Sequence, residues 1–363
     1  METQRTIDLL KRNPRQVVAI AVILAAVVSL FAYVGGFLTP HRLSPNRMTD
    51  AIEVTGGGPY PGFRRAHAKG ICIAGSFVSS NEAKALSGAS VFLGDVVPVT
   101  GRFAESAPNP FTNDAEAAPV RSMALRLQPR GADEWRLGMN DTPGLHVSTP
   151  QAFYENVVAS TPDPRTGKPD PAKMQAYLDK HPETVAFLSR LRSRPFSTGF
   201  ANDSYNGVNG FVLVSSDGTR RLVRWSMQSE DPFVTLSPED RAKKSANYAF
   251  DELLARVAQG PMKWRFVATI AKPGDPNRAA EVWPEDREKV TLGELTITHA
   301  ESETTGNCQD INFDPLVLPH GIEPSDDPIP FARSAVYSVS FRRRTGEIKP
   351  PSAVANQHAG TPP

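Results

Sequence analysis

The proline content constrains the fold of this chain more than any other feature of its sequence. The 363 residues include 33 prolines, about twice the usual share of roughly 5%. Proline lacks the backbone N–H that the interiors of helices and sheets require, so frequent prolines interrupt regular elements. The chain is therefore expected to fold with short elements and many loops, and not as a helical bundle.

The charge balance and the cysteine count exclude several classes of protein. Lysine and arginine number 40 and aspartate and glutamate 39, which leaves a formal net charge of +1. Binding to nucleic-acid phosphates calls for an excess of basic residues, so no nucleic-acid partner is expected. Two cysteines are too few for a disulfide scaffold or a thiolate zinc cluster.

The N-terminal region has the features of a membrane anchor. Residues 17–38 carry no charge, and a helix of that length can cross the roughly 30 Å hydrocarbon core of a membrane. A basic flank precedes this run and indicates that the N-terminus is cytoplasmic and the remainder exported; it consists of Arg5, Lys11, Arg12 and Arg15. A cleaved signal peptide is the alternative, although no clear Ala-x-Ala site follows the run. We expect a cytoplasmic N-terminus and one transmembrane helix over residues 1–40, then a polar linker over 41–58.

Beyond the linker, the pattern is mostly β. Short alternating segments predict strands over 122–127, 210–214, 221–225, 263–268 and 290–297. Asp217 and Gly218 separate two of these segments, and both tolerate the positive φ that a hairpin turn requires. Strands joined by long connections, with helices grouped later, favour an α+β or β-barrel domain over alternating βαβ units.

Helices are predicted at two places, 172–192 and 238–259. The second has Ser237 as a suitable N-cap and Pro238 at its first turn. The final residues, 347–363, are rich in proline, alanine and glycine, and we expect them to be disordered.

Three separated clusters contain residues that are suited to chemistry. The first runs over 64–70 with the sequence Arg-Arg-Ala-His-Ala-Lys-Gly, and the second over 138–143 with Gly-Met-Asn-Asp-Thr-Pro. The third combines Gly-Ile-Glu-Pro-Ser at 321–325 with Arg-Ser-Ala-Val-Tyr at 333–337. Taken singly, each has an ordinary explanation: a structural histidine, a turn, and a solvated helix face.

In this order, however, the three clusters resemble those of the haem catalases. The resemblance covers residues 59–344 and is strongest to the short catalase-related peroxidases, which keep the haem β-barrel but lack the long N-terminal arm and the C-terminal flavodoxin-like domain. It implies an α+β fold over residues 59–346. The core would be an antiparallel catalase-type β-barrel with helices on the outside, preceded by the one transmembrane helix.

The resemblance also implies a haem b (heme b) cofactor and assigns residues to it. His67 matches the distal histidine, Asn140 the distal asparagine, and Tyr337 the proximal tyrosine that ligates iron. The other matches are residues that would surround the haem: Arg64, Arg102 and Arg344 at its propionates, Phe153 stacked on the porphyrin, and Arg333 beside the phenolate.

The expected chemistry independently calls for these residue types. A tyrosine can ligate iron as a phenolate if the metal and a neighbouring arginine stabilise its charged form, and Arg333 lies one helical turn from Tyr337. Cleavage of a peroxide O–O bond needs one group to take a proton and return it, which His67 can do. Asn140 can orient the peroxide without titrating, and two propionates suit bidentate arginines.

Departures from the catalase pattern favour peroxidase over catalase activity. Ala104 stands where catalases hold a serine that is hydrogen-bonded to the distal histidine, so the tautomer of His67 is expected to be less firmly fixed. Gly144 and Leu145 stand near positions that usually hold phenylalanine. The segment around the proximal Tyr337 also differs from the catalase pattern, because Ala335 and Val339 stand where catalases carry Phe and Asp. A roomier distal side should admit larger hydroperoxides and slow the dismutation of hydrogen peroxide.

The favoured interpretation is a haem peroxidase of the inner membrane. Its domain would lie in the periplasm and reduce organic hydroperoxides or hydrogen peroxide with a donor that the sequence does not identify. Three alternatives stay open: a true catalase, an enzyme that rearranges lipid hydroperoxides, and a non-catalytic haem or peroxide sensor. Cys72 is expected to be a buried thiol, with a bridge to Cys308 as the alternative in an oxidising compartment. The oligomeric state is left open.

Overall fold

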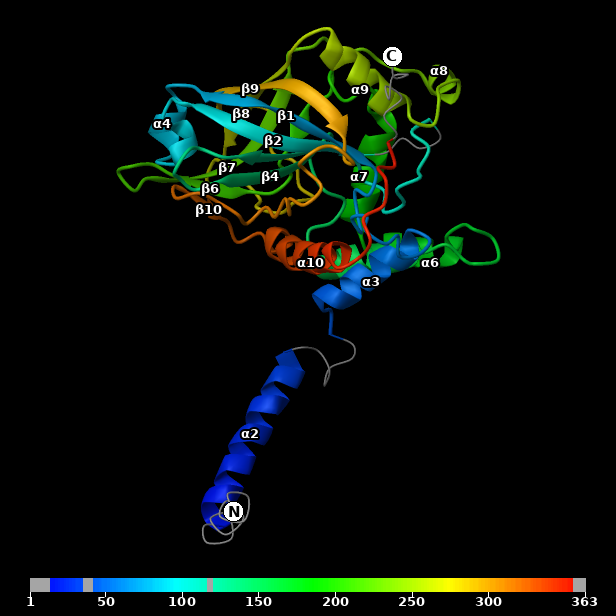
Figure 1. Cartoon of the computed structure of the whole chain (residues 1–363), viewed down its shortest axis with the longest axis vertical. Coiled ribbons are helices and arrows are strands. Elements are labelled where there is room, and N and C mark those ends of the chain that lie inside the picture. The colour runs from blue at the N-terminus through cyan, green and yellow to red at the C-terminus, as the bar shows by residue number, and fades with distance from the viewer. Residues whose placement is uncertain (1–13, 35–41, 116–119, 355–363) are drawn as a thin grey trace. The chain divides into compact units, whose positions relative to one another are not determined.

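A computed structural model describes residues 14–34, 42–115 and 120–354, which form parts of two units, residues 1–48 and 49–363 (Figure 1). In the first unit, helix α2 (Pro14–Val34) is long and apolar enough to cross a membrane. A membrane anchor and a signal sequence share this property. The residues expected to be cytoplasmic, 1–13, lie outside the described ranges.

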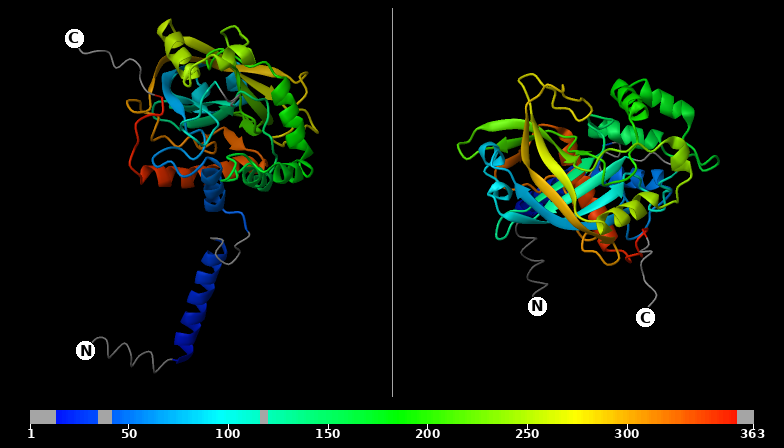
Figure 2. Two further views of the ribbon diagram at one scale, coloured as in Figure 1. Left: turned by 90° about the vertical axis from the view of Figure 1, so that its right-hand side faces the viewer. Right: turned by 90° about the horizontal axis from the view of Figure 1, so that it is seen from above.

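The second unit is built on an antiparallel β-barrel, as predicted (Figure 2). Its strands pair in the order β7–β5–β4–β3–β2–β1–β9–β8, and β8 pairs with β7 again, which closes the sheet. Strands β6 and β10 extend the sheet from β7. The bounds are β1 (Gly70–Ser79), β2 (Val96–Glu105), β3 (Arg121–Leu127), β4 (Trp135–Asn140), β5 (Tyr205–Asn206), β6 (Phe211–Val214), β7 (Arg220–Ser229), β8 (Met262–Ile270), β9 (Lys289–Ser302) and β10 (Ile322–Pro324).

The five predicted strand segments correspond to β3, β6, β7, β8 and β9. The predicted hairpin joins β6 to β7, and Gly218 adopts a φ of +84° in its turn. Strands β1, β2, β4, β5 and β10 are additional, and β1 and β2 are the longest of these. Gly75 interrupts the first and Pro98 and Gly101 the second, residues that weaken a strand pattern. Both strands are nevertheless paired on each side within the barrel.

Proline is the first residue of most helices in this part of the chain, in addition to interrupting regular elements. The helices of the second unit and its border are α3 (Pro45–Thr55), α4 (Ala83–Leu86), α5 (Pro150–Ala159), α6 (Pro171–Leu178), α7 (Pro182–Ser193), α8 (Pro238–Ala242), α9 (Tyr248–Ala258) and α10 (Pro328–Thr345). Most start with proline, whose fixed φ suits the first turn, where its missing N–H has no partner to lose. Asp327 and Ser237 cap α10 and α8 with side-chain oxygens.

Both predicted helices are broken in two. The first is divided into α6 and α7 because Pro182 cannot continue the helix that ends at Leu178. The second is divided into α8 and α9, and the intervening Ala246 carbonyl accepts hydrogen bonds from Lys69 Nζ (2.9 Å) and Asp114 N (3.0 Å). A continuous helix would have used that carbonyl internally.

The two segments expected to lack structure are partly ordered. The linker expected over 41–58 contains helix α3, and Glu53 within it forms an ion pair with Arg65 at 2.6 Å. Residues 347–354 of the expected disordered tail are tied to the domain, because Glu347 also pairs with Arg65 and Val354 is buried. Residues 355–363 lie outside the described chain.

The barrel interior is filled with side chains and is not a pore. Its core includes Phe103, Met123, Trp135, Trp225 and Phe266, all buried. Around the outside, α9 packs against β9 (Figure 1). Helix α10 contacts α5. A cofactor-sized ligand must therefore bind outside the barrel.

Candidate functional site

Three adjacent strands present a row of side chains on the outer face of the barrel. Ala104 of β2 pairs with Ser122 of β3, and Ser122 pairs with Asn140 of β4. Their neighbours Phe103 and Met123 point into the core. Because side chains alternate along a strand, Ala104, Ser122 and Asn140 lie side by side on the outside.

His67 lies against this row. Its Nδ1 is 3.0 Å from the Ser122 hydroxyl, which in turn donates to Asn140 Oδ1 at 2.8 Å. The main chain of His67 has a φ of +53°, in the left-handed region that non-glycine residues seldom occupy. Its carbonyl accepts a hydrogen bond from Arg102 Nη1 at 2.7 Å. The main chain of His67 is thus held by Arg102 and its ring by Ser122.

The surroundings of His67 keep its imidazole neutral. Burial, followed by the positive charges of Arg102, Arg333 and Arg64, lowers its pKa from 6.5 to about 3. A neutral imidazole retains one nitrogen lone pair, so His67 can accept a proton at ordinary pH.

Arg64, Arg102 and Arg344 form an arginine cluster beside His67, in which Arg102 and Arg344 are buried and Arg64 is half-buried. Arg64 Nη2 donates to the carbonyls of Cys308 (3.1 Å) and Ile311 (2.9 Å), and Arg344 also donates to Ile311, at 3.3 Å. Burial and the neighbouring guanidinium groups lower the pKa of Arg64, and burial and Arg102 lower that of Arg344 to about 10.

The arginine cluster has an excess of positive charge. Within the described chain, Glu303 is the only carboxylate that forms an ion pair with any of the three guanidinium groups, to Arg102 at 2.7 Å. Among the same residues, the buried Nε of Arg64 has no hydrogen-bond partner. Such a group of donors suits an anionic ligand with two carboxylates, such as the expected haem b.

Helix α10 brings Arg333 and Tyr337 to the same region. Arg333 Nη2 donates to Tyr337 Oη at 3.2 Å, and Nη1 donates to Asn209 Oδ1 at 2.9 Å. Asn209 donates in turn to Asp327 at 2.8 Å. A Cβ on Gly138 of β4 would lie 2.9 Å from the Arg333 guanidinium, so the glycine allows the close approach of α10.

Most of the residues singled out from sequence therefore meet in one place. His67, Asn140, Arg64, Arg102, Arg344, Arg333 and Tyr337 are connected by direct contacts or by electrostatic interactions. Phe153 lies on α5, with its ring 5.5 Å from that of His146. Sequence reasoning missed Ser122, Glu303 and Asn209.

Ser122 corrects the expectation that His67 lacks a side-chain partner. Ala104 offers no hydroxyl, but the residue directly opposite it on β3 supplies one. One further expectation is corrected, because Cys72 is bonded to Cys308 and is not a free thiol.

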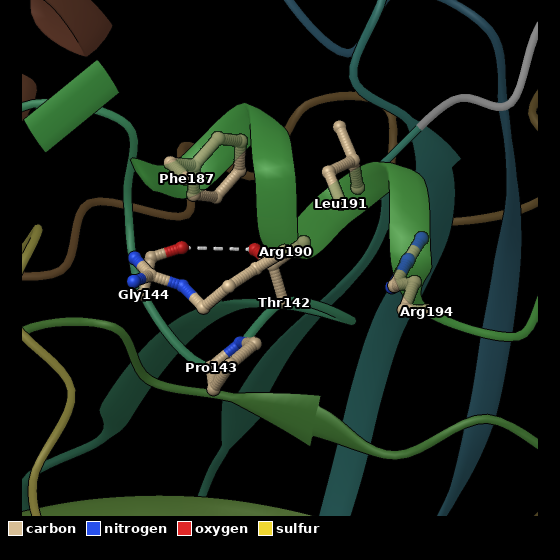
Figure 3. Close-up of a pocket in the computed structure, with 7 residues that line it drawn as sticks. All are labelled: Thr142, Pro143, Gly144, Phe187, Arg190, Leu191 and Arg194. Atoms are coloured by element: carbon tan, nitrogen blue, oxygen red, sulfur yellow. Dashed lines mark hydrogen bonds between the residues drawn. The ribbon is translucent and has the colours of Figure 1, made fainter. Parts of the chain in front are cut away.

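A small apolar pocket of about 120 Å³ lies beside the segment that follows Asn140 (Figure 3). Two of its lining residues are joined by a hydrogen bond, which Thr142 Oγ1 donates to the Gly144 carbonyl at 3.0 Å. Arg194 pairs with Asp141 at 2.7 Å. The lining residues are Thr142, Pro143, Gly144, Phe187, Arg190, Leu191 and Arg194.

The family model for catalase matches residues 62–350, so the chain belongs to the catalase family. The chain is 38% identical to a catalase-related peroxidase of Synechococcus elongatus, over 88% of this chain and 95% of that protein. It is 33% identical to a catalase-related peroxidase of Mycolicibacterium paratuberculosis, over 84% and 96%. The fold is similar to that of a fungal catalase, with a TM-score of 0.71 and 18% identity over 78% of this chain and 59% of that one. The chain is accordingly an oxidoreductase of the peroxidase type.

Proposed function

We propose that the chain is a haem b peroxidase that reduces organic hydroperoxides and hydrogen peroxide with electrons from a separate donor. The observation that carries the proposal is the arginine cluster. Among the described residues, only Arg102 of the three arginines forms an ion pair, with Glu303, and charges that are removed from water without counter-charges are costly. The two propionates of haem b are the counter-charges that this cluster lacks.

Tyr337 is the proposed iron ligand. Arg333 donates a hydrogen bond to Tyr337 Oη, the atom that would bind ferric iron. Phe153 of α5 is proposed to stack on the porphyrin. When bound, the haem supplies the redox chemistry, and the protein positions it and moves protons.

His67 and Asn140 act on the peroxide in this proposal. The neutral imidazole of His67 takes the proton from one peroxide oxygen and returns it to the oxygen that leaves. The Asn140 amide donates a hydrogen bond that orients the peroxide, and it does not titrate. His67 is thus the acid–base group, and Asn140 a binding group.

The substrate is proposed to include organic hydroperoxides. Gly144 and Leu145 leave the segment after Asn140 without phenylalanine side chains, and the apolar pocket lies beside it. An organic hydroperoxide carries an apolar group that such a pocket can hold.

The domain is proposed to lie on the periplasmic side of the inner membrane, anchored by α2. The basic residues before the apolar run support this orientation. The Cys72–Cys308 bond agrees with an oxidising compartment.

Product analysis with a defined lipid hydroperoxide, with and without an electron donor, tests the proposal. We expect the hydroperoxide to be reduced to the alcohol only when the donor is present. Rearranged products without donor would indicate a rearranging enzyme, and rapid oxygen evolution from hydrogen peroxide would indicate a catalase. Haem binding without any turnover would indicate a sensor.

A further inference from the structure

We propose that Ser122 is a positioning residue for the reaction, and that its one hydroxyl sets both the basic nitrogen of His67 and the orientation of the Asn140 amide. The inference rests on the proposed function, in which His67 moves the proton and Asn140 orients the peroxide. Ser122 itself touches neither peroxide nor haem in this proposal.

The geometry places the Ser122 hydroxyl between the two side chains. Ser122 is buried on β3, a strand that is paired on both sides within the barrel. Its Oγ lies 3.0 Å from His67 Nδ1 and 2.8 Å from Asn140 Oδ1, both within hydrogen-bonding distance. The two groups are therefore linked through a rigid element.

Counting protons gives the chain of hydrogen bonds a direction. A serine hydroxyl has one proton to donate, and the Oδ1 of asparagine can only accept. The proton of Ser122 is therefore directed at Asn140, and towards His67 its oxygen can only accept. His67 must then carry its hydrogen on Nδ1, which leaves the lone pair on Nε2.

The same direction fixes the amide of Asn140. With Oδ1 engaged by Ser122, the NH₂ group of the amide is turned away from Ser122 and is free to donate. A donor is the group that can bind a peroxide oxygen. One hydroxyl thus prepares a base on His67 and a donor on Asn140.

The register explains how this chain does without a serine at position 104. Ala104 and Ser122 are directly paired across β2 and β3, and the Cβ atoms of such pairs lie about 4.5–5.5 Å apart. A hydroxyl on the opposite strand can therefore reach the same imidazole. From β3 it also reaches Asn140, its partner on β4.

Ser122→Ala and Ser122→Thr test the inference in the haem-loaded protein. We expect Ser122→Ala to lower the second-order rate constant for peroxide by about 10–100-fold, the effect typical of a group that orients a reacting residue. Ser122→Thr keeps the hydroxyl and should stay within about threefold of the unaltered protein. Ser76→Ala on β1 is the matched control. Haem absorbance and thermal unfolding report any general damage to the fold.

The combination with His67→Ala separates positioning from a merely structural role. If Ser122 acts through His67 and Asn140, Ser122→Ala should lower the residual rate of His67→Ala by a clearly smaller factor than it lowers the rate of the unaltered protein, because only the contact with Asn140 is then left to lose. The inference is overturned if Ser122→Ala leaves the rate unchanged, if Ser122→Thr is as slow as Ser122→Ala, or if the losses simply multiply. A protein without haem or peroxide turnover would refute the proposed function instead.

Discussion

His67 combines a backbone conformation and an electrostatic environment that few histidines share. Its φ of +53° carries strain, of about 1–3 kcal/mol for such residues. The hydrogen bond from Arg102 to its carbonyl and the contact of Ser122 with its ring hold it in place. Burial and the nearby guanidinium groups lower the pKa of His67 and keep its ring neutral. These features suit a proton acceptor better than a structural histidine.

Substitution of His67 and Asn140 separates their proposed roles. We expect His67→Ala to lower the rate of peroxide-dependent donor oxidation by about 10²–10⁴-fold, the usual contribution of general acid–base catalysis. Asn140→Ala should have a smaller effect, because it removes only an orienting hydrogen bond. Stopped-flow kinetics with hydrogen peroxide at equal haem content would measure both. Equal, small effects would mean that neither side chain activates the peroxide.

Glu105 gives the folded protein a pH dependence of a defined sign. Burial and the neighbouring Asp114 carboxyl raise the pKa of Glu105 from 4.5 to about 8. The folded state therefore binds this proton more tightly than the unfolded chain. The contribution of Glu105 to the free energy of unfolding is therefore complete below the pKa that this group has in the unfolded chain. It is lost as the pH rises from about 4.5 to 8.

Glu105→Gln should remove this loss, because the amide stays neutral. Its free energy of unfolding should exceed that of the unaltered protein by an amount that grows between pH 4 and pH 8, to the order of 1–3 kcal/mol. Urea unfolding at several pH values would measure the difference. A difference that does not grow towards pH 8 would show that Glu105 is charged in the folded state.

At the scale of elements, the sequence predicted those with a regular pattern. Strands with clean alternation, such as β3 and β8, were predicted close to their observed bounds, whereas β2 was missed because Pro98 and Gly101 interrupt it. The motif residues of the site were found because they stand in short motifs whose order along the chain resembles that of the haem catalases. Ser122 and Glu303 were missed because only the pairing of strands and the folding of the 303–311 segment bring them to His67 and Arg102.

The Cys72–Cys308 bond anchors the segment that binds the arginine cluster. It joins β1 to a segment whose carbonyls at 308, 309 and 311 accept hydrogen bonds from Arg64 and Arg344. Removing both sulfurs should therefore loosen the arginine cluster as well as the fold.

The double variant Cys72→Ser, Cys308→Ser should release haem faster to apomyoglobin than the unaltered protein. It should also lose about 2–4 kcal/mol of stability, the usual contribution of a disulfide. Using both serines avoids a reactive free thiol. If stability falls but haem release is unchanged, the segment does not support the arginine cluster.

At the scale of the whole molecule, the packed interior of the barrel places the site on its outer face, where strands, α10 and the 303–311 segment meet. The sequence predicted the barrel through the resemblance and the N-terminal helix through its lack of charge. Neither the barrel nor the N-terminal helix depends on the details of side-chain packing. The arginine cluster does depend on them, because packing decides which arginines lie together.

The orientation in the membrane can be tested with a reporter at the C-terminus. A fusion after Pro363 should be active only if the reporter works outside the cytoplasm, because the basic flank precedes the apolar run. Deletion of residues 1–40 should give a protein that no longer sediments with membranes and still binds haem. If a reporter that works only in the cytoplasm is active at this position, the orientation is the opposite of the one proposed.

The absorption spectrum of the haem-reconstituted Tyr337→Phe variant tests the central claim most directly. The unaltered protein should show a five-coordinate, high-spin ferric haem with a phenolate charge-transfer band. Tyr337→Phe should lose that band or the haem itself, while the control Tyr60→Phe should keep both. The account is contradicted if Tyr337→Phe leaves the spectrum unchanged and substitution of His146 or His320 abolishes it.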